Sequence, residues 1–249
     1  MNITDEVFQN PTVKQVIFQI IFPNLFFLDS KIGDIQLLIM REFPESKIIY
    51  KQKFIVVDSG DDNSETQKKQ FDGSGKIWQF ESPKGHRLNI LHNSLDIASE
   101  HHKTYNNEGH DKFRDLINFS VSSFLEVTKL PIINRIGLRY IDECPIPSLT
   151  NESFSEYYNS TFPLNRFSIP STKASSFSIV TKTNNHNLMY AETIADTENK
   201  PKLILDFDAF SENINSSNFL SISDELHDII KNEYFKTIKT PVIEHMRKI

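Results

Sequence analysis

The stretch Pro11-Thr-Val-Lys-Gln-Val-Ile-Phe-Gln-Ile-Ile-Phe22 returns in pattern 120 positions later as Pro131-Ile-Ile-Asn-Arg-Ile-Gly-Leu-Arg-Tyr-Ile-Asp142. In both stretches apolar residues alternate with other residues, which is typical of a strand with one buried face. The two match without a gap, so the sequence predicts an internal duplication. The matched apolar positions are Val13, Val16, Phe18 and Ile20 in the first stretch and Ile133, Ile136, Leu138 and Tyr140 in the second.

The segments after these two stretches share one order of predicted elements. We expect a helix over Asp29–Phe43 and another over Asn151–Phe162, both ending in Phe-Pro, because proline disfavours helical geometry in the residue before it. Three strands and an amphipathic helix then follow in each half. The strands are Lys47–Asp58, Lys76–Ser82, His86–Ile97, Ala174–Thr183, Leu188–Ala195 and Pro201–Phe210, and the helices are Asp111–Lys129 and Ser223–Ile238, with Ser223 and Asp224 as N-cap candidates.

These elements predict an α+β fold made by tandem duplication of a β-α-β-β-β-α unit. Antiparallel sheet with helices packed on one face buries the apolar side of every element. We assign residues 1–130 to the first repeat and 131–249 to the second, packed as one pseudo-twofold globule, with Ser59–Gly75 as a mobile surface loop. The unit resembles the repeat of TATA-box-binding-protein-like and helix-grip folds, a likeness of fold that implies no function.

Composition excludes several classes of protein. The chain has 249 residues, 38% of them hydrophobic, which supplies a large core. The net charge of −6 disfavours nucleic-acid binding by phosphate neutralisation, and the single cysteine, Cys144, excludes an internal disulfide framework. The longest apolar stretch, Val16–Leu28, is too short to span a bilayer, and acidic Asp5 and Glu6 are not typical of a signal peptide. We expect a cytoplasmic protein with no membrane segment.

One run of residues resembles a known family. Together with Trp78-x-Phe80, Leu205-Asp-Phe-Asp208 and Leu226-His227, the run Arg135-Ile-Gly-Leu-Arg-Tyr-Ile141 is similar to a sporadically distributed prokaryotic family of proteins of this length. The resemblance covers nearly the whole chain and implies a mobile or defence-related locus. It implies no activity and transfers no catalytic residue. This chain departs from the family pattern at Asp142, where the family usually has Asn.

Strand alternation predicts one polar face. On the strand that contains Ile136 and Leu138, the side chains of Arg135 and Arg139 point away from the apolar set, and Asp206 and Asp208 do the same on Leu203–Phe210. The functional interpretation is a recognition face that offers guanidinium groups to an anion and carboxylates to a cation. The simpler interpretation is that the arginines pair with the aspartates across strands.

His227 completes the predicted binding residues. It follows Leu226 on an amphipathic helix, within the family-like closing motif. A hydrogen bond from its imidazole to the sheet is the simpler interpretation, and a general base is the alternative. We expect most of the other histidines to be solvated.

No metal, cofactor or catalytic site is predicted. Asp206-x-Asp208 resembles part of a two-metal site, but the chain lacks a phosphate-holding glycine loop. His101, His102 and His110 would ligate a metal only if their loop folded back. Cys144 precedes a proline and has no histidine neighbour in the sequence, so we interpret it as an inert apolar residue.

The leading functional hypothesis is a non-enzymatic binding protein. An open sheet face, or a groove between the repeats, would engage a partner protein or a small ligand. One alternative is an RNA-processing protein like the CRISPR repeat endonucleases built from tandem ferredoxin-like units, which the net charge disfavours. The other is a small-ligand pocket protein, with Phe54, Trp78, Phe80, Tyr190 and Phe207 as lining candidates. We expect a homodimer, paired through sheet edges or through Lys236–Ile249.

Overall fold

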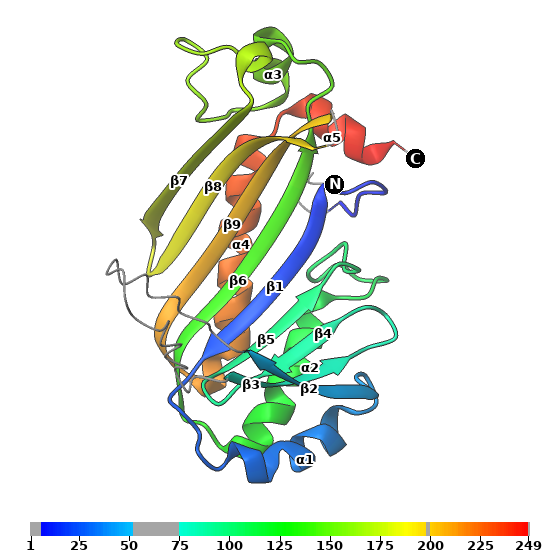
Figure 1. Cartoon of the computed structure of the whole chain (residues 1–249), viewed down its shortest axis with the longest axis vertical. Helices are drawn as coiled ribbons and strands as arrows, with labels where there is room; N and C mark the ends of the chain where they lie inside the picture. The colour runs from blue at the N-terminus through cyan, green and yellow to red at the C-terminus, as the bar shows by residue number, and fades with distance from the viewer. Residues whose placement is uncertain (1–5, 52–74, 198–199, 249) are drawn as a thin grey trace, which may run out of the picture.

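The computed structural model describes residues 6–51, 75–197 and 200–248. Within these ranges the fold is α+β: nine strands form one antiparallel sheet, and five α-helices accompany it (Figure 1). The predicted mobile loop 59–75 lies outside the described residues except for Gly75, which begins a strand. No helix in the described ranges is both long enough and apolar enough to cross a membrane.

The strands and helices have the following bounds. The strands are β1 (Val13–Ile21), β2 (Glu45–Lys51), β3 (Gly75–Glu81), β4 (Arg87–Ile90), β5 (Ser94–Ser99), β6 (Ile132–Pro145), β7 (Ala174–Thr183), β8 (His186–Thr197) and β9 (Lys200–Asn215). The helices are α1 (Leu28–Ile39), α2 (Phe113–Thr128), α3 (Asn151–Tyr157), α4 (Phe219–Thr237) and α5 (Thr240–Arg247).

The two stretches that match in sequence form the middle of the sheet. The strand order is β2-β3-β4-β5-β1-β6-β9-β8-β7, and β1 lies antiparallel to β6 with Phe18 opposite Leu138. Each of these strands pairs on its other side with the last strand of its own half, β1 with β5 and β6 with β9. From the central pair outward, the remaining strands of each half therefore follow the reverse of their order in the chain, β5 to β2 on one side and β9 to β7 on the other.

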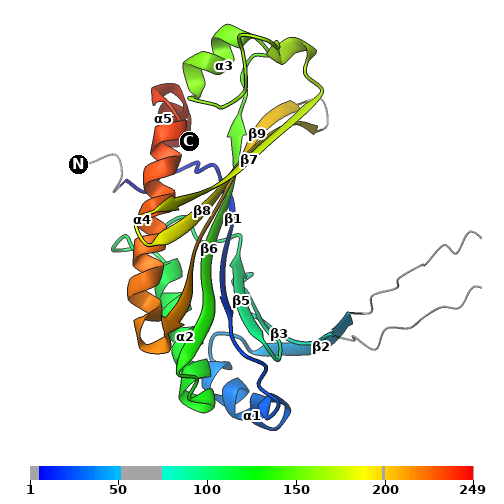
Figure 2. The ribbon, with the colours of Figure 1, turned by 90° about the vertical axis from the view of Figure 1, so that its left-hand side faces the viewer.

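Helices cover one face of the sheet only. In Figure 2, α2, α4 and α5 lie on one side, and the strands curve so that the opposite side is concave. The apolar sets of the central strands, including Phe18, Ile136, Leu138 and Phe207, face the helices and are fully buried. Over the described residues no helix covers the concave face (Figure 2), as the alternation predicted.

The first half contains one strand more than the predicted unit. The expected single strand over His86–Ile97 is wrong, because the chain reverses at His92 and Asn93 and forms the hairpin β4–β5. The Leu91 amide donates to the Ser94 carbonyl at 2.8 Å across this tight turn. The alternation continues through both strands, so periodicity alone did not reveal the break.

Several helix ends also differ from the predictions. The first helix ends at Ile39 and α3 ends at Tyr157, both before the predicted phenylalanines. The N-cap prediction is wrong, because α4 begins earlier, at Phe219, and Asp224 instead binds Arg114 from α2. The predicted bounds of β7 are confirmed, and those of α2 are confirmed to within two residues.

Candidate functional site

The two predicted arginines and the two predicted aspartates lie together on the concave face. The guanidinium of Arg139 donates two hydrogen bonds to the Asp206 carboxylate, of 2.8 Å from Nε and 2.5 Å from Nη2. Arg135 donates from Nη2 to Asp208 Oδ2 at 2.8 Å. The simpler interpretation, cross-strand ion pairing, is therefore what the structure contains.

Gly137 makes room for the side chain of Arg135, which extends farther along the sheet than that of Arg139. Arg135 lies opposite Glu212 in the strand register, yet its guanidinium reaches Asp208 by passing over the Phe210 ring at 4.5 Å from the centroid. A Cβ atom on Gly137 would stand only 2.5 Å from Arg135 Nη1. The spacing Arg-x-Gly-x-Arg thus lets one arginine lie flat along the sheet while the other pairs beside it.

The paired side chains on this face are only partly shielded from water. Burial raises the pKa of the Asp208 carboxyl, and the neighbouring Arg135 opposes that rise. The Arg139 side chain is 40% exposed despite its bond to Asp206.

The same face carries further polar contacts between strands across most of the sheet. These contacts are Lys202–Glu143 at 2.6 Å, Lys47–Glu81 at 2.6 Å, Gln79–Asn89 at 2.7 Å and Asn89–Asp96 at 2.7 Å.

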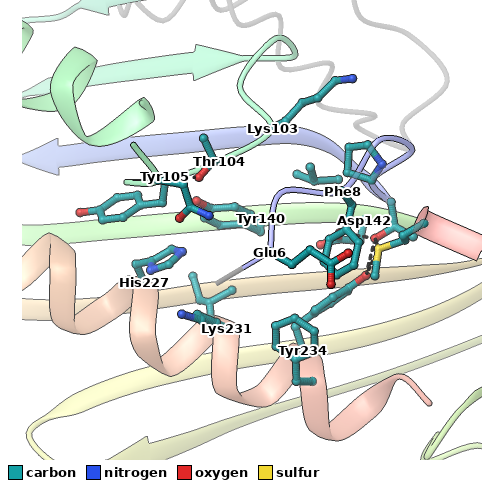
Figure 3. A pocket seen from close by; sticks show the side chains of 17 residues that line it. Glu6, Phe8, Lys103, Thr104, Tyr105, Tyr140, Asp142, His227, Lys231 and Tyr234 are labelled. Atoms are coloured by element: carbon teal, nitrogen blue, oxygen red, sulfur yellow. Dashed lines mark hydrogen bonds between the residues drawn. The ribbon is translucent and has the colours of Figure 1, made fainter. Parts of the chain in front are cut away.

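His227 does not join this set, because the sheet lies between them. It stands on α4, on the helix-covered side, and stacks on Tyr105 with ring centroids 4.2 Å apart (Figure 3). Its contact with the sheet is the Tyr140 ring, 6.0 Å away, so the predicted hydrogen bond to the sheet is replaced by a ring contact. The five predicted binding residues therefore belong to two separate sites.

A cavity of about 140 Å³ lies beside His227 (Figure 3). Its walls come from α4, from α5, from the segment before β1 and the first residue of β1, from the loop before α2 and from β6. The sequence did not predict this cavity, because no local pattern connects these segments. The lining residues include Glu6, Phe8, Thr12, Lys103, Tyr105, Tyr140, Asp142, His227, Lys231, Tyr234, Phe235 and Met246.

Asp142 stands at the wall that β6 contributes. Its side chain is buried, with 5% of the residue exposed, and it accepts one hydrogen bond, 2.8 Å from the Thr12 hydroxyl to Oδ1. Burial raises the pKa of this carboxyl to about 7. The Tyr234 hydroxyl lies 2.6 Å from the Thr12 oxygen and also donates to Met246 Sδ at 3.3 Å.

Two buried histidine–serine pairs form a second arrangement that sequence analysis missed. His86 precedes β4 and its Nδ1 lies 3.1 Å from the Ser99 hydroxyl, while His186 begins β8 and bonds the Ser211 hydroxyl. His86, His102 and His186 are all buried, so the expectation that most histidines are solvated is wrong for these three. Both serines are buried too, which keeps them from acting as nucleophiles toward a substrate.

The two serine-bonded histidines, His86 and His186, also each lie near a glutamate. His186 Nε2 lies 2.7 Å from Glu225 on α4, and His86 Nε2 lies 3.9 Å from Glu42, just after α1. In the strand register, Ser99 stands opposite Val16 of β1 and Ser211 opposite Ile136 of β6. The two pairs thus occupy corresponding places in the two halves of the sheet.

Metal and nucleophile chemistry gain no support from the described residues. No group of three or more His, Cys, Asp or Glu side chains there is arranged to hold a metal ion. Asp206 and Asp208 are engaged by arginines, as above. Cys144 is buried on the helix side of β6, and this burial raises the pKa of its thiol well above the usual range.

Comparison of the sequence with family models and with curated proteins finds no match. The resemblance drawn from the Arg135–Ile141 run stays a prediction.

Proposed function

We propose that this chain is a non-catalytic binding protein that recognises a partner protein on the concave face of its sheet. The observation that carries the proposal is a broad, curved sheet face, uncovered by helices among the described residues, whose polar side chains are held by cross-strand pairs. Preorganised polar groups lose little entropy when they bind, so such a face suits specific recognition.

Arg139 is the residue best placed to contact a partner. Asp206 holds its guanidinium through Nε and Nη2, so the Nη1 donors have no partner among the described residues. Because 40% of the side chain is exposed, we propose that Arg139 offers these donors to a carbonyl or carboxylate oxygen of a partner protein.

Charge matching favours a protein over a nucleic acid as the partner. The basic groups Arg135, Arg139, Lys47 and Lys202 each pair with a carboxylate on the same face. A phosphate backbone would have to displace these carboxylates, and its binding depends on cations that are available to it. Recognition through hydrogen bonds to a protein surface requires no such exchange.

We further propose that the face arose by duplication of one unit. The gapless offset of 120 residues places Phe18 in register with Leu138, and these two residues also stand opposite each other where β1 meets β6. A local twofold axis through this pair would relate the two strands. The His86–Ser99 and His186–Ser211 pairs, which occupy corresponding places, support the same relation.

The exposed edge of the sheet supports the homodimer proposal. The edge strand β7 is exposed along most of its length, including the apolar side chains of Phe177, Ile179 and Val180. A long apolar edge strand is a template for pairing with another chain.

The cytoplasmic location and the mobile or defence-related locus of a prokaryote remain proposals that rest on composition and on the family resemblance.

The test compares proteins that co-purify with three versions of the full chain. Quantitative mass spectrometry after affinity capture from a prokaryotic lysate would use wild type, Arg139→Ala and Arg247→Ala. Arg247 is a matched control, because it is a similarly exposed arginine bonded to a carboxylate, Glu6, away from the concave face. We expect a specific partner to be lost with Arg139→Ala and kept with Arg247→Ala.

Two results would overturn the proposal. One is equal recovery of every captured protein by wild type and Arg139→Ala. The other is capture of RNA that weakens steeply with salt, which would favour the RNA-processing alternative.

A further inference from the structure

We infer that the cavity beside α4 binds a small primary ammonium compound, with the Asp142 carboxylate as its counterion. This site is separate from the concave face of the proposed function, because it lies on the opposite side of the sheet (Figures 2 and 3).

Asp142 is a buried carboxyl whose hydrogen bonding is incomplete. It accepts the Thr12 hydroxyl at Oδ1, and no other hydrogen bond or ion pair reaches it from the described residues. The carboxylate of a residue that is only 5% exposed normally has several donors or a cation beside it, because leaving it unpaired costs free energy. Its side chain lines the cavity, so a ligand can supply the missing donor.

The shortage of hydrogen-bond donors around the Asp142 carboxyl fits its raised pKa. Burial raises the pKa of Asp142 to about 7 because the charged form lacks compensation inside the protein. An ammonium group at the second oxygen would supply both a positive charge and N–H donors. The same ligand would therefore favour the ionised carboxylate, as in other buried ion pairs.

Aromatic rings supply the rest of the environment that an ammonium group needs. Tyr140 shares the inner face of β6 with Asp142, two residues away, and Tyr234 reaches the same point from α4 through Thr12. Phe8 and Phe235 also line the cavity. The faces of such rings attract cations, and the attraction increases when water is excluded.

The size of the cavity limits the ligand. Its volume of about 140 Å³ is below the roughly 300–1,000 Å³ that is usual for sites of drug-sized molecules. A nucleotide or a lipid is therefore excluded, whereas an amine of a few carbon atoms fits. His227 and Lys231 line the part of the cavity away from Asp142 (Figure 3), where an anionic end of the ligand would be accommodated.

The experiment titrates the full chain with three probes of similar length, n-butylamine, 4-aminobutyrate and butyrate. Binding would be followed by protein-observed NMR at constant pH and ionic strength. We expect saturable shifts at the cavity residues with one or both of the amines and not with butyrate. A preference for 4-aminobutyrate would add an anion contact at the basic end to the ammonium site.

The deciding variant is Asp142→Asn, which keeps the shape and removes the charge. We expect it to weaken amine binding about tenfold or more, as loss of a charge-assisted contact predicts. Asp206→Asn makes the same chemical change on the concave face and serves as the matched control, so its amine affinity should equal that of wild type. The NMR spectrum of each variant would verify that it is folded.

The inference fails if neither amine binds, if butyrate binds as well as the amines, or if Asp142→Asn binds the amines like wild type. Arg139→Ala separates this site from the proposed function. Amine binding that survives in Arg139→Ala, together with loss of the protein partner, would show that the two sites are independent.

Discussion

The two faces of β6 use the same kinds of side chain in different ways. Arg139 and Asp142 are three residues apart, yet Arg139 is 40% exposed on the concave face and Asp142 is 5% exposed on the helix side. On the concave face Arg139 is paired with Asp206 and stays near water, so burying this pair costs little free energy on folding. On the helix side the carboxyl has one hydrogen bond, so its charged form is costly.

We propose that this difference separates the residues that stabilise the fold from those that recognise a partner. The helix side holds the apolar core, and changes there should alter the free energy of unfolding. The concave face holds paired polar groups that can be changed at little cost to folding. Changes on the two sides of the sheet test this division.

Phe18→Ala should destabilise the protein most. Phe18 is fully buried where β1 meets β6, and its truncation leaves a cavity that its neighbours cannot fill, which typically costs about 3–5 kcal/mol. Urea unfolding monitored by circular dichroism would measure the loss. Ile141→Ala, on the concave side of β6, is the control and should cost clearly less, whereas equal losses would contradict the assignment of the core to the helix side.

Asp142 should make the protein less stable as the pH rises from about 4 to about 7. In the unfolded chain its pKa is near the usual 3.8, and in the folded protein it is about 7, so the folded state binds more protons across this window. Three pKa units correspond to at most about 4 kcal/mol. Asp142→Asn should remove this decrease, as measured by melting temperature against pH.

His102 provides the opposite sign as an internal check. Burial lowers its folded pKa from 6.5 to about 4, so the unfolded state binds more protons and stability is lost as the pH falls through this range. With Asp142→Asn in place, stability should therefore decline only toward acid. Parallel pH profiles for wild type and Asp142→Asn would show that the carboxyl is not buried as described.

Arg139→Ala should change stability by no more than about 1 kcal/mol. The pair with Asp206 is bidentate but partly exposed, and solvent screens such pairs. Urea unfolding would measure this change beside the capture experiment proposed above. A loss of several kcal/mol would mean that the concave face is part of the folding core rather than a recognition face.

Gly137→Ala should have the smallest effect on stability, within about 1 kcal/mol, while disturbing one ion pair. A Cβ atom at this position would displace the guanidinium of Arg135, which is the flexible end of a side chain. Because Arg135 lowers the pKa of Asp208, the pKa of Asp208 should rise further, which ¹³C NMR of the carboxyl group would detect.

Gly33→Ala is the matched control for this substitution. Nothing lies within 4 Å of its added Cβ, and it stands inside α1, where alanine favours the helix by roughly 0.5–1 kcal/mol. We expect it to stabilise the protein without altering the Asp208 titration. An unchanged titration in Gly137→Ala as well would contradict the close approach of Arg135 to Gly137.

Local sequence patterns predicted much of the sheet and little of the sites. The alternation in Pro131–Asp142 identified the strand and placed Arg135 and Arg139 on the side away from Leu138, because neighbouring side chains of a strand point to opposite faces. The same alternation did not reveal the turn at His92–Asn93, since it continues through β4 and β5. Pairing partners across strands, such as Asp206 for Arg139, were predicted only as alternatives.

By itself, the sequence determined which side of each strand is apolar, and so which side the helices cover. This information is local, because it depends on a period of two residues along one strand. Only the tertiary structure decided that Thr12, Tyr105, Asp142 and His227 surround one cavity, and that His86 and His186 each meet a serine. These residues come from segments far apart in the chain, and no local signal relates them until the sheet register and the packing of α4 bring them together.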